Sequence, residues 1–170
     1  ALFVGISLGL GPRQVAQNMV DGLGWGLNKS TVIARTEQLR AYRQSSVMQY
    51  RESGVVRGFK RMANKASACM ACLLSDGEFF EVREDFSDHP NGACALVPVL
   101  SDMPERTWES GEDYFMSLSP EQQRARMGEM YFQEWKDGAF KLSELRSTAH
   151  SDVWGDAPKV TPLKELVGGQ

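Results

Sequence analysis

Three cysteines and one histidine lie in the middle of the chain with the spacing of a zinc site. Cys69 and Cys72 form a Cys-x-x-Cys pair, and His89 and Cys94 form a second pair further along. Zn²⁺ favours a tetrahedron of thiolates and imidazoles, and a Cys-x-x-Cys turn offers two thiolates at once. Because four protein ligands leave no open position, such a site stabilises a fold rather than catalysing a reaction. The sequence therefore predicts one structural Zn²⁺ bound by Cys69, Cys72, His89 and Cys94.

The cysteines also have two other interpretations, which the sequence leaves open. Free cysteines are often buried as small apolar side chains. A Cys-x-x-Cys pair can also be a redox couple or a disulfide, but redox pairs sit in a βαβ pattern that is not visible here. An odd number of cysteines, three in this chain, makes a disulfide framework awkward. Reduced thiols fit synthesis in the cytoplasm.

Charge is distributed unevenly along the chain. From Lys29 to Lys65 there are nine basic and two acidic residues, whereas from Ala66 onward nine basic residues stand against nineteen acidic ones. The stretch over 29–65 is here called the basic front, and the stretch from residue 66 onward the acidic rear. A basic front predicts a surface for nucleic acid or for an acidic partner. The alternative is that the two halves attract each other. The candidate partner-facing residues are Lys29, Arg40, Arg43, Arg51, Arg57, Lys60, Arg61 and Lys65.

The first eleven residues are apolar but do not have the pattern of a signal peptide. No basic segment precedes them, no Ala-x-Ala site follows, and the chain does not begin with Met. We therefore expect the interior of a longer protein. No apolar run reaches the length that crosses a bilayer, so no membrane partner is expected.

Helical patterns precede the cysteines, and strand patterns surround them. A short helix is predicted over 11–22, a flexible turn over 22–26, and a long helix over 30–53 with Ser30 as its N-cap and Gly54 after its end. A strand over 55–62 follows. Next come a hairpin, with arms at 73–74 and 79–82 around Asp76-Gly77, and a returning strand over 93–99 that Pro98 places at an edge. The apolar side of the long helix comprises Val32, Thr36, Leu39, Val47 and Tyr50, and is interrupted by Arg43.

The last third has mostly helical signals. After a polar connector over 101–106, Ser119-Pro120-Glu121-Gln122 predicts a helix start with a reciprocal cap. That helix would carry Met127, Met130, Tyr131 and Trp135 and end at Gly138, and two further helices would start at Ser143 and Thr161. The expected fold class is α+β: a long helix packed on a small zinc-stapled antiparallel sheet over 1–100, followed by a helical C-terminal extension over 101–170.

Taken in order, these segments resemble the phage head morphogenesis family, the Mu F-like minor capsid proteins. Residues 33–37 read I-A-R-T-E, which is similar to the family's helix signature, and 50–55 continue the likeness. The Cys-x-x-Cys pair and His89-Pro90-Asn91 are similar to the family's metal-site segments, and 112–138 to its helical extension. The likeness covers roughly residues 5–168. One departure is that this chain has Gly92 and Ala93 where the family's H-P-N-C-R-C motif has its first cysteine and its arginine. The fourth ligand must therefore be Cys94.

The resemblance implies a non-enzymatic virion component. Such a protein would be made in the host cytoplasm and act in the capsid interior or at the portal vertex, in head assembly or DNA ejection. Its implied partners are the portal protein and the major capsid protein, and packaged DNA could be bound without sequence preference. For Arg35, Thr36 and Glu37 the resemblance favours a structural polar network over an active site.

Two other functions remain open. A metal-dependent nuclease could use His89 as general base beside Asp88 and Asn91, but it needs an open metal position, which thiolate ligands close. A zinc-stapled DNA-binding module fits the basic front and not the acidic rear. His150 is isolated and expected at the surface, and no Ser/His/Asp set, phosphate-binding loop or H-E-x-x-H motif is present.

Overall fold

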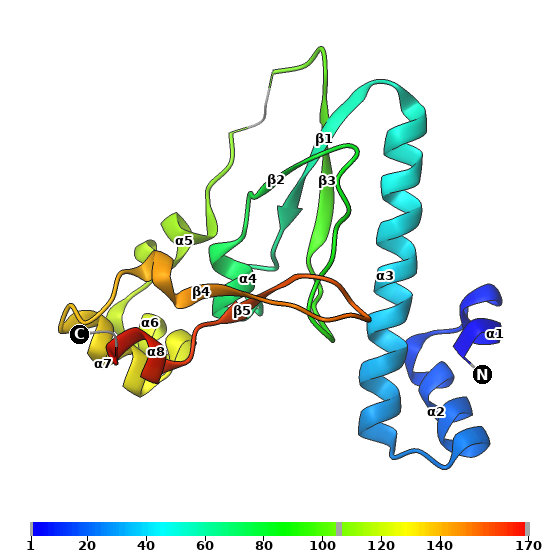
Figure 1. Ribbon diagram of the computed structural model, residues 1–170, viewed down its shortest axis with the longest axis horizontal. Helices are drawn as coiled ribbons and strands as arrows, with labels where there is room; N and C mark the ends of the chain where they lie inside the picture. The colour runs from blue at the N-terminus through cyan, green and yellow to red at the C-terminus, as the bar shows by residue number, and fades with distance from the viewer. Residues whose placement is uncertain (1, 105–106, 169–170) are drawn as a thin grey trace.

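The computed structural model describes residues 2–104 and 107–168. Residues 1, 105–106 and 169–170, which belong to the apolar opening, the connector and the end of the expected extension, lie outside this description. The fold is α+β, as expected, with a long helix beside a small antiparallel sheet (Figure 1). The elements are α1 (Leu2–Ser7), α2 (Pro12–Leu23), α3 (Leu27–Ser53), β1 (Val56–Met62), α4 (Met70–Leu74), β2 (Phe79–Glu81), β3 (Ala95–Leu100), α5 (Gly111–Ser117), α6 (Pro120–Met127), α7 (Glu129–Lys136), the 3₁₀ helix η1 (Leu142–Leu145), β4 (Arg146–Ala149), β5 (Ala157–Val160) and α8 (Leu163–Val167).

Helix α3 starts one turn earlier than predicted and ends where predicted. Gly26 is the N-cap, so the assignment of Ser30 as N-cap is wrong; its N–H already donates to the Gly26 carbonyl inside the helix, and its side chain is buried. At the other end, Gly54 is left-handed with φ 66°, a conformation that glycine adopts without strain. Helix α2 packs on the lower half of α3, away from the sheet, and α1 packs on α2 (Figure 1).

The sheet has the order β2-β1-β3, and both neighbours of β1 are antiparallel to it. Pro98 lies on the edge strand β3, as predicted, because proline has no N–H for a second neighbour. Phe59 of β1 is fully buried and stacks on Phe80 of β2, with ring centroids 5.5 Å apart. The ring of Tyr50, from α3, lies 6.3 Å from that of Phe59, so α3 covers this face of the sheet.

The predicted hairpin around Asp76-Gly77 is wrong in its first arm. Leu73 and Leu74 belong to helix α4, because Cys69 caps this helix and its sulfur accepts the N–H of Cys72. The chain after the turn forms β2 and pairs with β1 instead. This helix brings two of the predicted metal ligands to its first turn.

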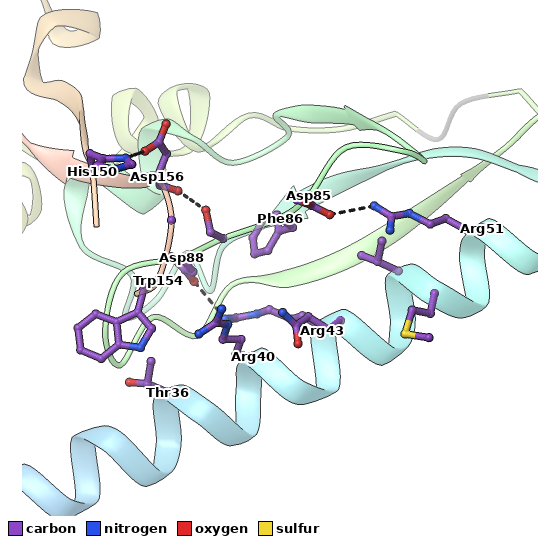
Figure 2. Close-up of a pocket in the computed structure, with 15 residues that line it drawn as sticks. Thr36, Arg40, Arg43, Arg51, Asp85, Phe86, Asp88, His150, Trp154 and Asp156 are labelled. Carbon is purple, nitrogen blue, oxygen red and sulfur yellow. Dashed lines mark hydrogen bonds and ion pairs between the residues drawn. The ribbon is translucent and has the colours of Figure 1, made fainter. Parts of the chain in front are cut away.

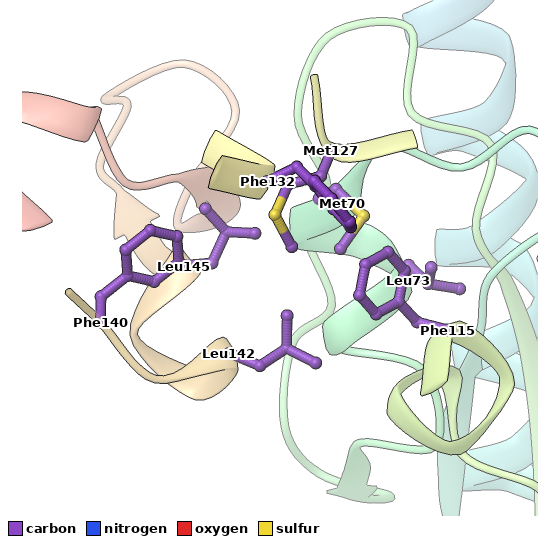
Figure 3. Packing of buried hydrophobic residues seen from close by; sticks show 8 residues of the cluster. All are labelled: Met70, Leu73, Phe115, Met127, Phe132, Phe140, Leu142 and Leu145. Carbon is purple, nitrogen blue, oxygen red and sulfur yellow. The ribbon is translucent and has the colours of Figure 1, made fainter. Parts of the chain in front are cut away.

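The C-terminal part packs back onto α4 and shares its core (Figure 3). Met70 and Leu73 of α4 pack with buried residues from beyond the connector, so the parts expected on either side of residue 100 share one hydrophobic cluster. The predicted extension is not purely helical, since β4 and β5 form a second, two-stranded sheet. The buried cluster comprises Met70, Leu73, Phe115, Met127, Phe132, Phe140, Leu142 and Leu145.

The helix predicted from Ser119 starts correctly and then breaks. Ser119 and Gln122 form the expected capping box. Gly128, with φ 88°, separates α6 from α7, and Met130 is 68% exposed, so it does not belong to the apolar side assigned to it. Of the two later starts, α8 follows Pro162 as expected, and a 3₁₀ helix occupies the region of Ser143. Among the described residues, no helix is long and apolar enough to span a membrane.

Candidate metal centre

The four predicted ligands gather around Cys72. Cys69 and Cys72 stand at the first turn of α4, His89 lies in the loop after β2, and Cys94 directly precedes β3. The ligand atoms of Cys69, Cys72 and His89 all lie within 4.8 Å of one another, and those of Cys72, Asp88 and Cys94 form a second such group. These two groups share Cys72 and could hold a metal ion.

The sulfur–nitrogen distances in the group of Cys69, Cys72 and His89 are close to those of tetrahedral coordination, whereas Cys94 belongs to the second group, with Cys72 and Asp88. Zinc bonds of about 2.3 Å to sulfur and about 2.0 Å to nitrogen place the two ligand atoms roughly 3.6 Å apart. The Nε2 atom of His89 lies 3.6 Å from the sulfur of Cys69 and 3.1 Å from that of Cys72. The Nδ1 atom of His89 lies 2.9 Å from the Pro90 carbonyl oxygen, which leaves Nε2 as the ligating nitrogen.

The thiols and the imidazole strongly perturb one another. The pKa of Cys69 falls to about 4, chiefly because the Cys72 thiol donates a hydrogen bond to its sulfur. The same bond raises the pKa of Cys72, and a bond from Cys72 lowers the pKa of Cys94. The hydrogen bond with Cys69 also raises the pKa of His89 to about 9. In the metal-free protein these contacts favour the thiolate at Cys69 and Cys94 and oppose it at Cys72, so metal binding must displace the protons of Cys72 and His89.

Asp88 lies beside the ligands as a buried carboxylate with several partners. Its Oδ2 lies 3.2 Å from Arg43 Nη2, and its Oδ1 lies 3.4 Å from Arg61 Nη1. It also accepts the backbone N–H groups of His89 and Cys94, at 3.0 and 3.4 Å. In the sequence alone, Asp88 stands out only as part of a possible nuclease. A signal was available, because Arg43 interrupts the apolar side of α3, and a buried arginine needs a carboxylate.

Arg43 and Arg61 are buried, so their assignment to a partner-facing surface is wrong. Arg43 is 7% exposed and Arg61 2% exposed. Arg43 reaches from α3 into the segment over 88–94, here called the ligand loop. There its Nε donates to the Cys94 carbonyl and its Nη2 to the Gly92 carbonyl, both at 2.8 Å. Arg43 pairs with Asp88, and Arg61 lies between Asp88 and Glu78, whose Oε2 is 3.5 Å from Arg61 Nε.

Gly92 leaves the space that the Asp88 carboxylate occupies. A Cβ atom at Gly92 would lie 2.5 Å from Cγ and Oδ2 of Asp88. Gly92 therefore leaves room for a buried carboxylate, and Cys94 is the cysteine that joins Cys72 and Asp88 in one group.

Most other basic residues of the front are engaged within the molecule. Arg51 donates to three backbone carbonyls and pairs with Asp85 at 3.0 Å, and Lys65 pairs with Glu109 at 2.7 Å. Arg40 donates to the Val153 carbonyl. These contacts support the alternative that the two halves attract each other. Among the remaining basic residues of the front, the Lys29 ammonium lies over the Trp25 ring and the Arg57 guanidinium over the Phe79 ring. Lys60 lies on β1 and is half-buried.

Two of the three signature residues form polar links between segments. The Thr36 hydroxyl donates to Val32 O and accepts the N–H of Asn91 at 2.8 Å, so the I-A-R-T-E segment contacts the H-P-N segment. Glu37 accepts the indole N–H of Trp154 at 2.8 Å. Arg35 is exposed. Thr36 and Glu37 thus connect α3 to two different loops.

A groove of about 670 Å³ runs along α3 (Figure 2). Arg40, Arg43 and Arg51 line it from the helix, and Phe86 and Trp154 from the opposite loops. Its charged lining is largely paired internally, by the ion pairs of Arg43 with Asp88 and of Arg51 with Asp85. His150 lies at its rim, exposed as expected, and hydrogen bonds to Asp156 and Asp152 raise its pKa.

Comparisons with protein-family models, curated proteins and solved structures gave no match to this chain.

Proposed function

We propose that this chain is a non-enzymatic structural protein of a phage head, stabilised by one Zn²⁺ bound to Cys69, Cys72, His89 and Cys94. The observation that carries the zinc site is the convergence of two sequence-distant ligand pairs around Cys72. Three sulfurs and one imidazole nitrogen form a ligand set typical of structural zinc. With a thiol available for the fourth position, the site is closed to substrate.

The small core near the ligands explains why a metal would be needed. The buried cluster there contains Ala63, Cys72 and Cys94, and among the described residues the partly buried hydrophobic side chains packed against it are Ala68 and Phe86. Such short side chains bury little apolar area. Structural zinc can contribute on the order of 10 kcal/mol to folding, which is comparable with the whole stability of a typical domain, about 5–15 kcal/mol. The metal would hold α4, the ligand loop and β3 together.

The virion role rests on the sequence resemblance and on how two of its segments meet. Thr36 of the I-A-R-T-E segment accepts the N–H of Asn91 in the H-P-N segment. The two stretches that carry the resemblance therefore form one structural unit. We propose that the protein is made in the host cytoplasm and acts in the capsid interior or at the portal vertex. Its proposed partners are the portal protein and the major capsid protein.

Two side-chain placements argue against the alternative functions. For a nuclease, Asp88 should be available to a metal-bound water, but it is held by Arg43 and Arg61. For a DNA-binding module, the basic front should face outward, but these same arginines are buried. DNA remains a candidate partner only for exposed cations such as Lys29 and Arg35.

Fractionation of DNA-filled heads tests the virion role. A tagged chain should be recovered with purified particles at a few copies each and should cross-link to the portal or the major capsid protein. Cys72→Ala should lower its recovery, whereas Met130→Ala, at an exposed position of α7, should not. A chain that stays entirely in the soluble fraction of a particle-producing lysate would contradict the proposal. Plasmid cleavage by the zinc-loaded protein would favour the nuclease instead.

A further inference from the structure

Arg43 carries a full charge from the long helix to the part of the loop that holds Asp88, His89 and Cys94. Its guanidinium donates to the carbonyls of Gly92 and Cys94 and pairs with Asp88. Asp88 in turn accepts the backbone N–H groups of His89 and Cys94, both of which are candidate ligands. A continuous set of buried contacts therefore runs from α3 to the metal centre.

The formal charges of the ligand side chains, Asp88 and the two buried arginines cancel when a divalent metal is bound to three thiolates. Zn²⁺ with three thiolates and a neutral imidazole carries −1, and the Asp88 carboxylate adds −1. Arg43 and Arg61 supply +2, and the side chains of Arg43, Arg61 and Asp88 are 8%, 3% and 1% exposed. Since a buried charge is costly unless it is compensated, the two arginines and the metal–thiolate group each favour the presence of the other.

We infer that Arg43 couples metal binding to the docking of α3 on the sheet. Metal binding fixes Cys94 and with it the carbonyls that Arg43 contacts, and docking of α3 orients the same loop for the metal. Arg43 is a positioning residue here, because it touches the loop backbone and Asp88 and no ligand atom. The inference rests on the zinc site proposed above and adds that the docking of α3 regulates metal binding there.

Thermodynamic linkage makes the coupling reciprocal. If the contacts of Arg43 raise the zinc affinity by some factor, zinc must stabilise the docked helix by the same factor. Removing an outer-sphere partner of a metal site typically lowers the affinity 10–100-fold. We therefore expect Arg43→Met to weaken zinc binding by about that factor, although Met preserves most of the aliphatic volume of the side chain.

Zinc competition against a chromophoric chelator measures the affinity of the full chain. Arg35→Met is the matched control, because Arg35 is an exposed cation on the same helix. We expect a 10–100-fold loss for Arg43→Met and less than about twofold for Arg35→Met. The absorption bands of the Co²⁺-loaded protein, which report the ligand field, should shift in Arg43→Met and stay unchanged in Arg35→Met. Affinity and spectrum equal to wild type in Arg43→Met would overturn the inference.

Hydrogen exchange of the wild-type chain provides a test that needs no variant. Removing zinc should increase amide exchange over residues 43–53 of α3, which contain no ligand. Equal exchange in the zinc-loaded and metal-free protein would overturn the coupling even if Arg43→Met does not fold. A wild-type chain that binds no zinc would instead contradict the proposed metal site, so the two failures are distinguishable.

Discussion

Replacing Asp88 by asparagine should destabilise the zinc-loaded protein strongly while barely changing its shape. Asparagine keeps the volume but removes the charge, and it turns an NH₂ group toward at least one guanidinium. Arg43 and Arg61, with side chains 8% and 3% exposed, would then lack their shared counter-ion. Breaking a buried ion pair by removing one partner costs about 3–5 kcal/mol. Because Arg43 keeps its bonds to the Gly92 and Cys94 carbonyls, we expect the lower end, about 3 kcal/mol.

Urea unfolding of the zinc-loaded protein measures this loss. With an m-value of about 2 kcal/mol/M, the midpoint should fall by roughly 1.5 M. Asp85→Asn is the matched control, because Asp85 also pairs with an arginine but its side chain is 99% exposed. Its effect should stay within about 0.5 kcal/mol. A loss below about 1 kcal/mol for Asp88→Asn, or equal losses in both variants, would refute the assignment of Asp88 as the shared counter-ion.

Three further predictions concern the ligand loop, Cys69 and the break after α6. Gly92→Ala should cost about 1–3 kcal/mol in thermal unfolding, because its Cβ would lie 2.5 Å from the Asp88 carboxylate. The control Gly22→Ala, whose Cβ would have nothing within 4 Å, should be neutral or stabilising. Equal melting curves for the two variants would contradict this packing. In the metal-free protein Cys69 should react with iodoacetamide nearly as fast at pH 6 as at pH 8, since a pKa of about 4 keeps it a thiolate at both. An ordinary thiol would slow roughly a hundredfold between these values, and that slowing would contradict the lowered pKa; zinc should suppress the reaction. Gly128→Ala should cost about 1 kcal/mol in urea unfolding, because φ is 88° there, and an unchanged midpoint would show that α6 and α7 can join without strain.

The sequence was sufficient to predict those features of the fold that interactions between near neighbours decide. Gly54 ends α3, Pro98 lies on an edge strand, and Ser119 begins α6 with its capping box, each as predicted. These features depend on backbone geometry and on bonds between near neighbours. The Cys/His spacing predicted one set of four ligands, and the structure has two groups that share Cys72: Cys69, Cys72 and His89, and Cys72, Asp88 and Cys94.

The errors arose where long-range contacts decide. Leu73 looked like a strand residue, but Cys69 caps a helix there and Leu73 is buried in a core shared with Phe115, which lies beyond the connector. Asp88 is the clearest omission, because its role appears only when Arg43 and Arg61 meet at one point in space. A charged residue on the apolar side of a helix predicts a buried partner but does not say which carboxylate it is.

Metal analysis of the full chain, purified without chelator, tests the central claim most directly. Native mass spectrometry with elemental analysis should find one zinc per folded chain, and Cys72→Ala should lose it together with the protection of α3 and β1 from hydrogen exchange. A wild-type protein that is metal-free, does not take up added zinc and still unfolds cooperatively would contradict the account.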